Sequence, residues 1–193
     1  MRELSLHILD IVQNSVAACA DAVTISIEED TERDVLSFSV ADNGRGMEQE
    51  TADHAADSDY TTRTTGKGGA GLPLLKAVAI ACNGSFAIES SPGAGTLVTA
   101  SFPMRHTDRP PLGDMVSTML ALMTGREEIE YHYRHRKGSR VFAFASRDLT
   151  TVLDGLPFHH PEVYRWLKEY LIEGEKSLDK KGRQEPSKHG NMV

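Results

Sequence analysis

Apolar residues recur every three or four positions at the start of the chain, over residues 4–22. Asp10 and Asn14 lie four residues apart and therefore project from the same side of the predicted helix. Their oxygens can polarise a water molecule or bind Mg²⁺, which prefers hard oxygen ligands. The same spacing is also typical of the solvent-facing side of an ordinary helix. The helix itself is predicted to be amphipathic, with its apolar face formed by Leu4, Ile8, Ile11, Val12, Val16 and Cys19.

Two alternating segments follow this helix and predict a β-hairpin. Residues 23–29 and 34–42 each alternate apolar and polar side chains, and a charged turn lies between them. The second segment runs into Asp42-Asn43-Gly44-Arg45-Gly46, where two glycines permit a tight backbone path and the close approach of a ligand. Asp42 ends the strand, where it can accept a hydrogen bond from an amino group.

Residues 48–65 contain almost no large apolar side chain, which predicts a short helix followed by a mobile lid. Glycines at positions 66, 68, 69 and 71 then precede an apolar helix over residues 72–82. Glycine-rich backbone that leads into a helix N-terminus favours anions, and phosphate groups are the natural occupant. Two further strands, residues 85–91 and 95–103, are expected to complete a four-stranded sheet.

The second half of the chain predicts a small α+β accessory unit, residues 105–173, that begins with a polar linker ending in two prolines. His132 and His135 would point to opposite faces of a strand, which argues against a shared metal. From residue 174 the chain has nothing to bury, so a disordered tail, residues 174–193, is expected. Within the unit we expect a methionine-rich helix ending at Gly125, a hairpin that turns at residues 136–138, and helices over residues 147–153 and 161–172.

Composition narrows the class of protein. The chain has 193 residues, of which 39% are hydrophobic and 25% charged, as in ordinary globular proteins. No apolar run approaches the length of about 18 residues that a membrane span needs, and the charged amphipathic pattern at the start leads us to expect a helix there instead of a signal peptide. Residues 1–104 carry 15 acidic and 6 basic side chains, whereas binding of a phosphate backbone needs a cationic surface. We therefore expect a cytoplasmic protein whose partners are neither nucleic acid nor membrane.

Four segments in a fixed order resemble one known family. They are ILDIVQNSVAA, DNGRGM, TTGKGGAGLPLLK and SPGAGTLVTASFP. Together they resemble the N-box, the two glycine boxes with the end of the lid, and the terminal glycine-threonine strand of GHKL-type (Bergerat-fold) ATP-binding domains. This superfamily includes histidine kinases, anti-sigma-factor serine kinases, type II topoisomerases and heat-shock chaperones. The resemblance covers residues 1–104 and implies a two-layer α/β sandwich that binds ATP with Mg²⁺.

The resemblance also implies roles for individual positions. Asn14 matches the Mg²⁺ ligand, and Asp42 matches the aspartate that receives the adenine amino group. Arg63 and Lys67 lie where cations of the lid meet the phosphates, and Thr96 matches a threonine beside the adenine-bound aspartate. The expected cofactor-binding residues are Asn14, Asp42, Gly44, Gly46, Arg63, Lys67, Gly69, Gly71, Leu72 and Thr96.

Asp10 departs from the family pattern, in which glutamate commonly stands four residues before the asparagine and acts as general base. Aspartate is one methylene shorter, so Asp10 is either a weakened catalytic base or a group that only supports the magnesium shell. The first helix also begins almost at Met1, so we expect no phosphoacceptor-histidine segment before it. Two hypotheses follow. The protein either transfers the γ-phosphate to a protein partner or to water, or it is a non-catalytic ATP-dependent switch for a partner.

Overall fold

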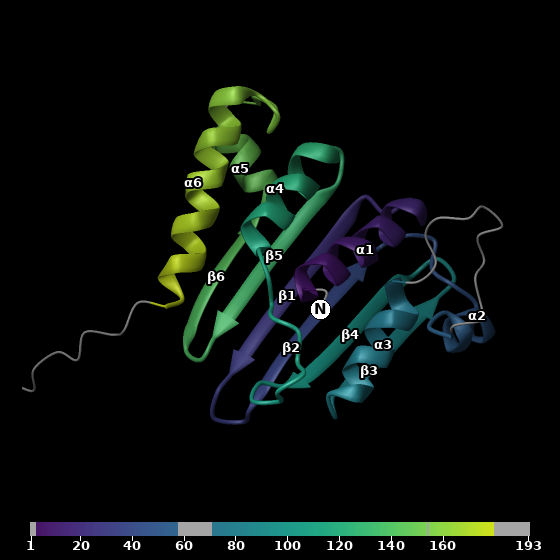
Figure 1. Ribbon diagram of the computed structural model, residues 1–193. Helices are drawn as coiled ribbons and strands as arrows, with labels where there is room; N and C mark the ends of the chain where they lie inside the picture. The colour runs from purple at the N-terminus through teal and green to yellow at the C-terminus, as the bar shows by residue number, and fades with distance from the viewer. Residues whose placement is uncertain (1–2, 58–70, 154, 180–193) are drawn as a thin grey trace, which may run out of the picture.

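The computed structural model describes residues 3–57, 71–153 and 155–179. The chain forms a mixed α/β structure in which β-hairpins alternate with one or two helices (Figure 1). In chain order the elements are α1 (Leu4–Ala17), β1 (Ala22–Asp30), β2 (Val35–Asp42), α2 (Gln49–His54), α3 (Gly71–Ala81), β3 (Ser85–Ser91), β4 (Gly95–Pro103), α4 (Met115–Gly125), β5 (Glu130–Lys137), β6 (Arg140–Ala145), α5 (Ser146–Val152) and α6 (Pro161–Ser177).

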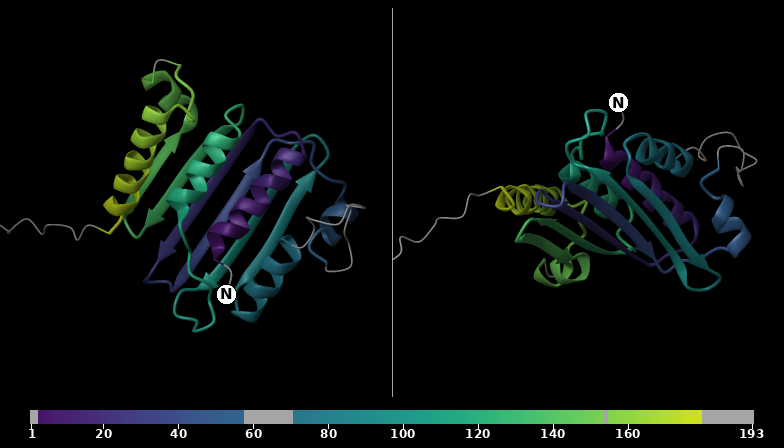
Figure 2. Two further views of the ribbon diagram at one scale, coloured as in Figure 1. Left: turned by 45° about the horizontal axis from the view of Figure 1, so that its top comes forward. Right: turned by 90° about the horizontal axis from the view of Figure 1, so that it is seen from below.

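The strands form one six-stranded sheet in the order β3-β4-β2-β1-β5-β6. Neighbouring strands are antiparallel except β1 and β5, which run parallel. Helices α1, α3 and α4 lie on one face of the sheet, and α6 lies beside α4 near the β6 edge (Figures 1 and 2). This arrangement confirms the predicted two-layer α/β sandwich.

The alternating patterns place one set of side chains against the helices. Ile25 of β1 pairs with Val40 of β2, and both are buried beneath the helical layer. The neighbouring pair, Ser26 and Ser39, points to the opposite face of the sheet, because successive side chains of a strand alternate between faces. The polar half of each pattern therefore forms the face that the helices leave uncovered.

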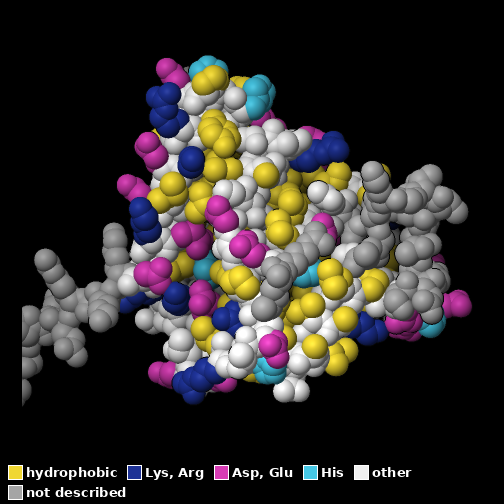
Figure 3. Space-filling view, in the orientation of Figure 1, with side chains coloured by type: hydrophobic (Ala, Val, Ile, Leu, Met, Phe, Trp, Pro, Cys, Tyr) yellow, Lys and Arg dark blue, Asp and Glu magenta, His cyan; other side chains and the backbone are white. Residues whose placement is uncertain are grey.

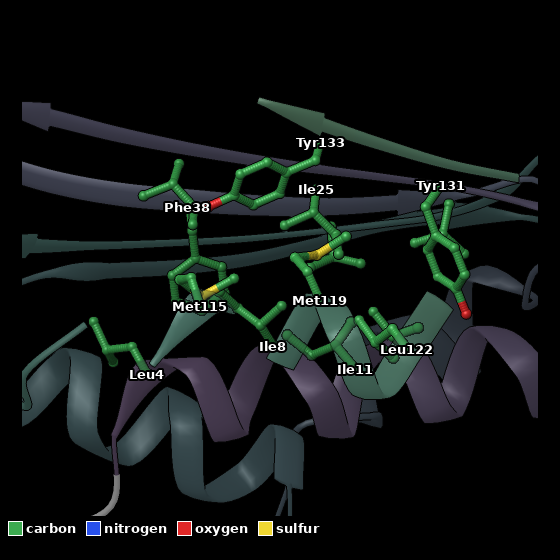
Figure 4. Close-up of a cluster of buried hydrophobic side chains, with 14 of the residues drawn as sticks. Leu4, Ile8, Ile11, Ile25, Phe38, Met115, Met119, Leu122, Tyr131 and Tyr133 are labelled. Atoms are coloured by element: carbon green, nitrogen blue, oxygen red, sulfur yellow. The ribbon is translucent and has the colours of Figure 1, made fainter. Parts of the chain in front are cut away.

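Helices α1 and α4 share one apolar core, which lies between them and the sheet (Figure 4). Ile8 and Ile11 of α1 are 0% and 4% exposed, and Met115 and Met119 of α4 are 3% and 1% exposed. Flexible methionine side chains fill irregular space well, which suits a position between a helix and a twisted sheet. The methionine-rich stripe of α4 is thus part of the core.

The sheet is larger than the four strands that the sequence predicts. Strand β5 pairs with β1 from Ala22↔Glu130 to Glu29↔Lys137, so the β5–β6 hairpin extends the same sheet. The sequence pattern of a hairpin identifies its two strands but not the sheet edge with which it pairs. The sequence therefore predicts a sheet of only four strands. The division of the chain at residue 104 stays a prediction, since both the sheet and the core cross it.

Helix α6 extends to Ser177, so the tail predicted to be disordered from Gly174 is wrong for its first residues. A Cβ atom at Gly174 would lie 2.1 Å from the ring of Phe142. The glycine therefore does not end the helix but allows it to approach β6 closely. Leu178, directly after α6, is 2% exposed and anchors the end of the helix, and residues 180–193 lie outside the described part of the chain.

The outer surfaces of α1 and α3 carry apolar side chains that the core does not use (Figure 3). Leu6 is 40% exposed, Leu74 is 40% exposed and Ile80 is 59% exposed. Within residues 3–57, 71–153 and 155–179, no helix has the length and apolarity needed to cross a membrane.

Candidate functional site

A row of polar side chains lies at one end of the sheet, beneath the helical layer. Asp42 of β2 pairs with Thr96 of β4, and Thr96 pairs with Ser90 of β3. All three share the strand parity of the buried residues Val40 and Val98, so they face the helices instead of the uncovered side. A carboxylate and two hydroxyls are thereby brought side by side on neighbouring strands.

The Asp42 carboxylate is held by three hydrogen bonds. Its Oδ1 accepts from the backbone N–H of Gly44 at 2.9 Å and of Thr96 at 3.2 Å. Its Oδ2 accepts from the Ser15 hydroxyl at 2.7 Å. Donors from α1, from β4 and from the loop after β2 fix the plane of the carboxylate, and Oδ2 keeps acceptor capacity for a further donor. Asp42 is thus preorganised to receive an N–H group of a ligand.

Ser15 is a site residue that sequence reasoning missed. It directly follows Asn14 on α1 and is 1% exposed, and its hydroxyl connects that helix to the end of β2. The available signal was a hydroxyl residue next to the apolar positions Ile11 and Val12 of the helix. A buried hydroxyl needs a hydrogen-bond partner, and Asp42 is the partner found here.

Gly44 and Gly46 are required by contacts within the chain. A Cβ atom at Gly44 would lie 2.8 Å from the carbonyl oxygen of Ala18, and one at Gly46 would lie 1.9 Å from that of Ser91. Gly46 also has φ +65°, a conformation that side chains disfavour. Both glycines let the loop after β2 pack against its neighbours. Whether they also contact adenine stays a prediction.

Asp10 and Asn14 project from α1 one turn apart, as the spacing predicts. An ideal Cβ at Gly71 would lie 3.1 Å from Asp10 Oδ2, so this carboxylate lies against the first residue of α3. Leu72, the next residue, packs against the core. Asn14 is partly exposed, and its side chain makes no hydrogen bond within the described part of the chain.

The structure leaves several predicted phosphate-binding residues outside its description. Arg63, Lys67 and Gly69 lie in the segment of residues 58–70, of whose placement nothing is described. The two sides of that segment are joined by an ion pair between Lys76 Nζ of α3 and Asp57 Oδ1, at 3.0 Å. Hydrogen bonds from His54 and, to a smaller extent, from Lys76 hold the pKa of the Asp57 carboxyl below its usual range.

Metal ligands are few in the described residues. No group of three or more histidine, cysteine, aspartate or glutamate side chains there is arranged to hold a metal ion. The amide oxygen of Asn14 and the nearby Asp10 carboxylate are hard donors that fit Mg²⁺. Mg²⁺ usually keeps several waters and takes further oxygens from phosphate groups, so a donor set this small is compatible with it.

The arrangement of α1, the loop after β2 and the β3–β4 turn agrees with a family assignment for the first half of the chain. The family model described as histidine kinase-, DNA gyrase B-, and HSP90-like ATPase matches residues 2–106, more than half of the chain. The chain belongs to this ATPase family. The predicted resemblance to GHKL domains is therefore confirmed, and residues 2–106 are a GHKL domain.

Curated relatives of this GHKL domain include sensor kinases. The sensor protein kinase FleS of Pseudomonas aeruginosa is 37% identical over 97 residues, which cover 50% of this chain and 24% of FleS. The non-motile and phage-resistance protein of Caulobacter vibrioides is 28% identical over 126 residues, or 60% of this chain and 15% of that protein. The chain thus spans a quarter or less of the length of these two relatives.

A solved structure shares the fold over a longer part of the chain. The N-terminal domain of a DNA repair protein superposes with a TM-score of 0.51 at 15% identity, and the match covers 74% of this chain and 52% of that one. This coverage exceeds what residues 2–106 alone provide. Part of the chain beyond the GHKL family match therefore also has a structural counterpart there.

Proposed function

We propose that the protein binds ATP with Mg²⁺ and is a GHKL ATPase or protein kinase directed at a partner protein. The observation that carries this proposal is the Asp42 carboxylate, which three hydrogen bonds orient toward an incoming N–H donor. The exocyclic amino group of adenine is such a donor. Membership of the family supports the same ligand, because its description is that of an ATPase.

In this proposal Asn14 holds Mg²⁺ and Asp10 acts from the same side of α1. The ion would neutralise charge on the phosphate groups. Asp10 would accept the proton of a water molecule or of a hydroxyl on the partner, as a general base does. The sensor kinase FleS, to which the chain is similar, supports transfer of phosphate to a partner over simple hydrolysis. Arg63, Lys67, Gly69 and Gly71 are the proposed phosphate contacts.

A partner protein is proposed from the surface next to the site. Leu6, Leu74 and Ile80 are exposed on the neighbouring helices α1 and α3, and exposed apolar side chains on adjacent elements favour binding of another protein.

The second candidate function is a non-catalytic switch, in which ATP alters affinity for the partner without being consumed. The position of Asp10 favours it. This carboxylate is one methylene shorter than the glutamate of typical GHKL members, and it lies against the backbone of Gly71. A base that lies too far from the reacting oxygen loses much of its effect.

Nucleotide binding tests the proposal directly. Titration calorimetry with Mg²⁺ should show binding of ADP and ATP, and Asp42→Asn should weaken it by about 1–3 kcal/mol because a partly buried acceptor is replaced by a mismatched group. Glu89→Gln is a matched control, since Glu89 is exposed and lies on the opposite face of β3. Absence of heat with wild-type protein would refute ATP binding.

A further inference from the structure

The Ser90 hydroxyl has a complete set of hydrogen-bond partners. It donates to the carbonyl oxygen of Gly95 at 2.9 Å and accepts from the backbone N–H of Met47 at 2.9 Å. Its third contact is with Thr96 Oγ1, at 3.0 Å. A hydroxyl has one hydrogen to donate and two lone pairs. A carbonyl oxygen can only accept, so all three contacts are satisfied together only when the hydrogen of Ser90 points to Gly95.

The direction of the Ser90–Thr96 contact follows from this count. Ser90 has no second hydrogen, so Thr96 must donate to Ser90 Oγ. The Thr96 hydroxyl is then committed, and only its lone pairs remain for a ligand. Asp42, joined to Thr96 through the Thr96 backbone N–H, also offers only acceptors. The end of the sheet therefore presents acceptors from two neighbouring strands.

We infer that Ser90 is a positioning residue that makes the base site selective for 6-amino over 6-oxo purines. An amino group at purine position 6 supplies hydrogens to acceptors, whereas an oxo group there would meet lone pairs with lone pairs. Ser90 acts through Thr96, because without it the Thr96 hydroxyl is free to rotate and donate. The inference rests on the proposed binding of an adenine nucleotide and extends it to the origin of base selectivity.

A merely structural role for Ser90 makes a different prediction. Ser90 also ties the loop after β2 to the β3–β4 turn, through Met47 and Gly95. Loss of these two hydrogen bonds would weaken the binding of every nucleotide by the same factor. Loss of the hydrogen-bond direction would instead change the ratio of two affinities. The ratio for ADP and inosine diphosphate is the decisive quantity, because these nucleotides differ only at position 6 and in the protonation of the neighbouring ring nitrogen.

The experiment measures dissociation constants of ADP and inosine diphosphate for wild type, Ser90→Ala, Ser90→Thr and Ser91→Ala by titration calorimetry. Wild type should prefer ADP by about tenfold or more, the usual effect of one mismatched buried hydrogen bond. Ser90→Ala should reduce this preference about fivefold to tenfold. Ser90→Thr keeps the hydroxyl and should keep the preference. Ser91→Ala should also keep it, since Ser91 is exposed and lies on the other face of β3.

A double-mutant cycle with Thr96→Val tests whether Ser90 acts through Thr96. Thr96→Val should lower the preference for ADP, and Ser90→Ala added to it should lower it no further, since coupled residues are not additive. An unchanged ADP preference in Ser90→Ala, or additive effects in the double variant, would overturn the inference while ATP binding stands. If wild-type protein binds neither nucleotide, both the proposed function and the inference fail.

Discussion

The length of the side chain at position 10 bears on whether the protein is an enzyme or a switch, because Asp10 is one methylene shorter than the glutamate of typical GHKL members. Asp10→Asn should leave ATP affinity within a few-fold but lower turnover by about 10²–10⁴-fold if the carboxylate is a general base. If Asp10 only supports Mg²⁺, affinity and turnover should fall together. Turnover is measured as release or transfer of labelled γ-phosphate, with and without cell extract.

Asp10→Glu is the matching probe in the opposite direction. The longer carboxylate should raise turnover if reach alone limits a weak catalyst, and it should change nothing in a switch. Asn14→Ala is the control, because loss of a metal ligand should weaken Mg²⁺-dependent binding in either case. A wild-type rate equal to background, and equal again in Asp10→Glu, would leave the switch as the function.

At the residue scale, the sequence predicts the site residues that belong to a family motif. It predicts less well the residues that hold them in place by hydrogen bonds. Asp42, Gly44 and Thr96 lie together in the structure, and each stands in a segment that the family motif covers. Ser15 and Ser90 were missed, although Ser15 lies inside the first of these segments, because a serine on a helix or an edge strand has no distinctive spacing. Only the pairing of β2, β4 and β3 shows which hydroxyl meets which acceptor.

At the scale of elements, a buried histidine joins α6 to the sheet. His135 of β5 is 3% exposed, and its Nε2 lies 3.1 Å from Glu29 of β1 while its Nδ1 lies 2.8 Å from Glu175 of α6. Carboxylates only accept hydrogen bonds, so both ring nitrogens must be protonated. Glu175 Oε1 also accepts a hydrogen bond from the Tyr133 hydroxyl at 2.7 Å. Lys137 Nζ lies 3.9 Å from Glu29 Oε2.

His135 keeps its positive charge at neutral pH although the side chain is buried. Desolvation is the largest single influence and opposes the charge, but the hydrogen bonds and charges of Glu175 and Glu29 together raise the pKa of His135 to about 9. The His135 hydrogen bond is the main reason that the pKa of Glu29 is lowered. Burial also raises the pKa of Tyr133, which keeps its hydroxyl protonated as a donor.

This cluster predicts how stability depends on pH. Because the pKa of His135 is raised from 6.5 to about 9 in the folded state, its contribution should be complete below pH 6.5 and be lost as the pH rises through 9. The full contribution is roughly 3 kcal/mol, from about 1.4 kcal/mol per pKa unit. Chemical denaturation from pH 6 to pH 10 measures it. His135→Gln should flatten this decline, whereas the exposed control His159→Gln should not. An equally steep decline in His135→Gln would contradict the assignment.

The local sequence pattern is sufficient to predict the helices and strands, but it does not predict how they pack against one another. Alternation predicts β1 to β6 and periodicity predicts the longer helices, because each pattern depends on neighbours in sequence. The parallel pairing of β1 with β5 joins residues about a hundred positions apart, and no local pattern records it. Likewise, Gly174 looks like a helix end in sequence, and only its contact with Phe142 shows that it serves close packing.

At the scale of the whole molecule, the shared core predicts cooperative unfolding. Met119 of α4 is 1% exposed and lies in the same core as α1. Met119→Ala should lower the free energy of unfolding by about 2–5 kcal/mol and should shift a single thermal transition that added ADP also shifts. Val152→Ala, at a side chain that is 73% exposed, should change stability by less than about 0.5 kcal/mol. Two separate transitions, with only one sensitive to Met119→Ala, would instead support an independent unit after residue 104.

The parallel pairing of β1 with β5 also affects the chain while it is being synthesised. Until residues 130–137 have left the ribosome, one edge of β1 has no partner for its backbone N–H and C=O groups. That edge borders Val23, Ile25 and Ile27, and unpaired apolar edges recruit other chains. A fragment that ends at residue 106, where the family match ends, would keep this edge open permanently. It would therefore aggregate more readily than the full chain, even though it contains every residue assigned to the nucleotide.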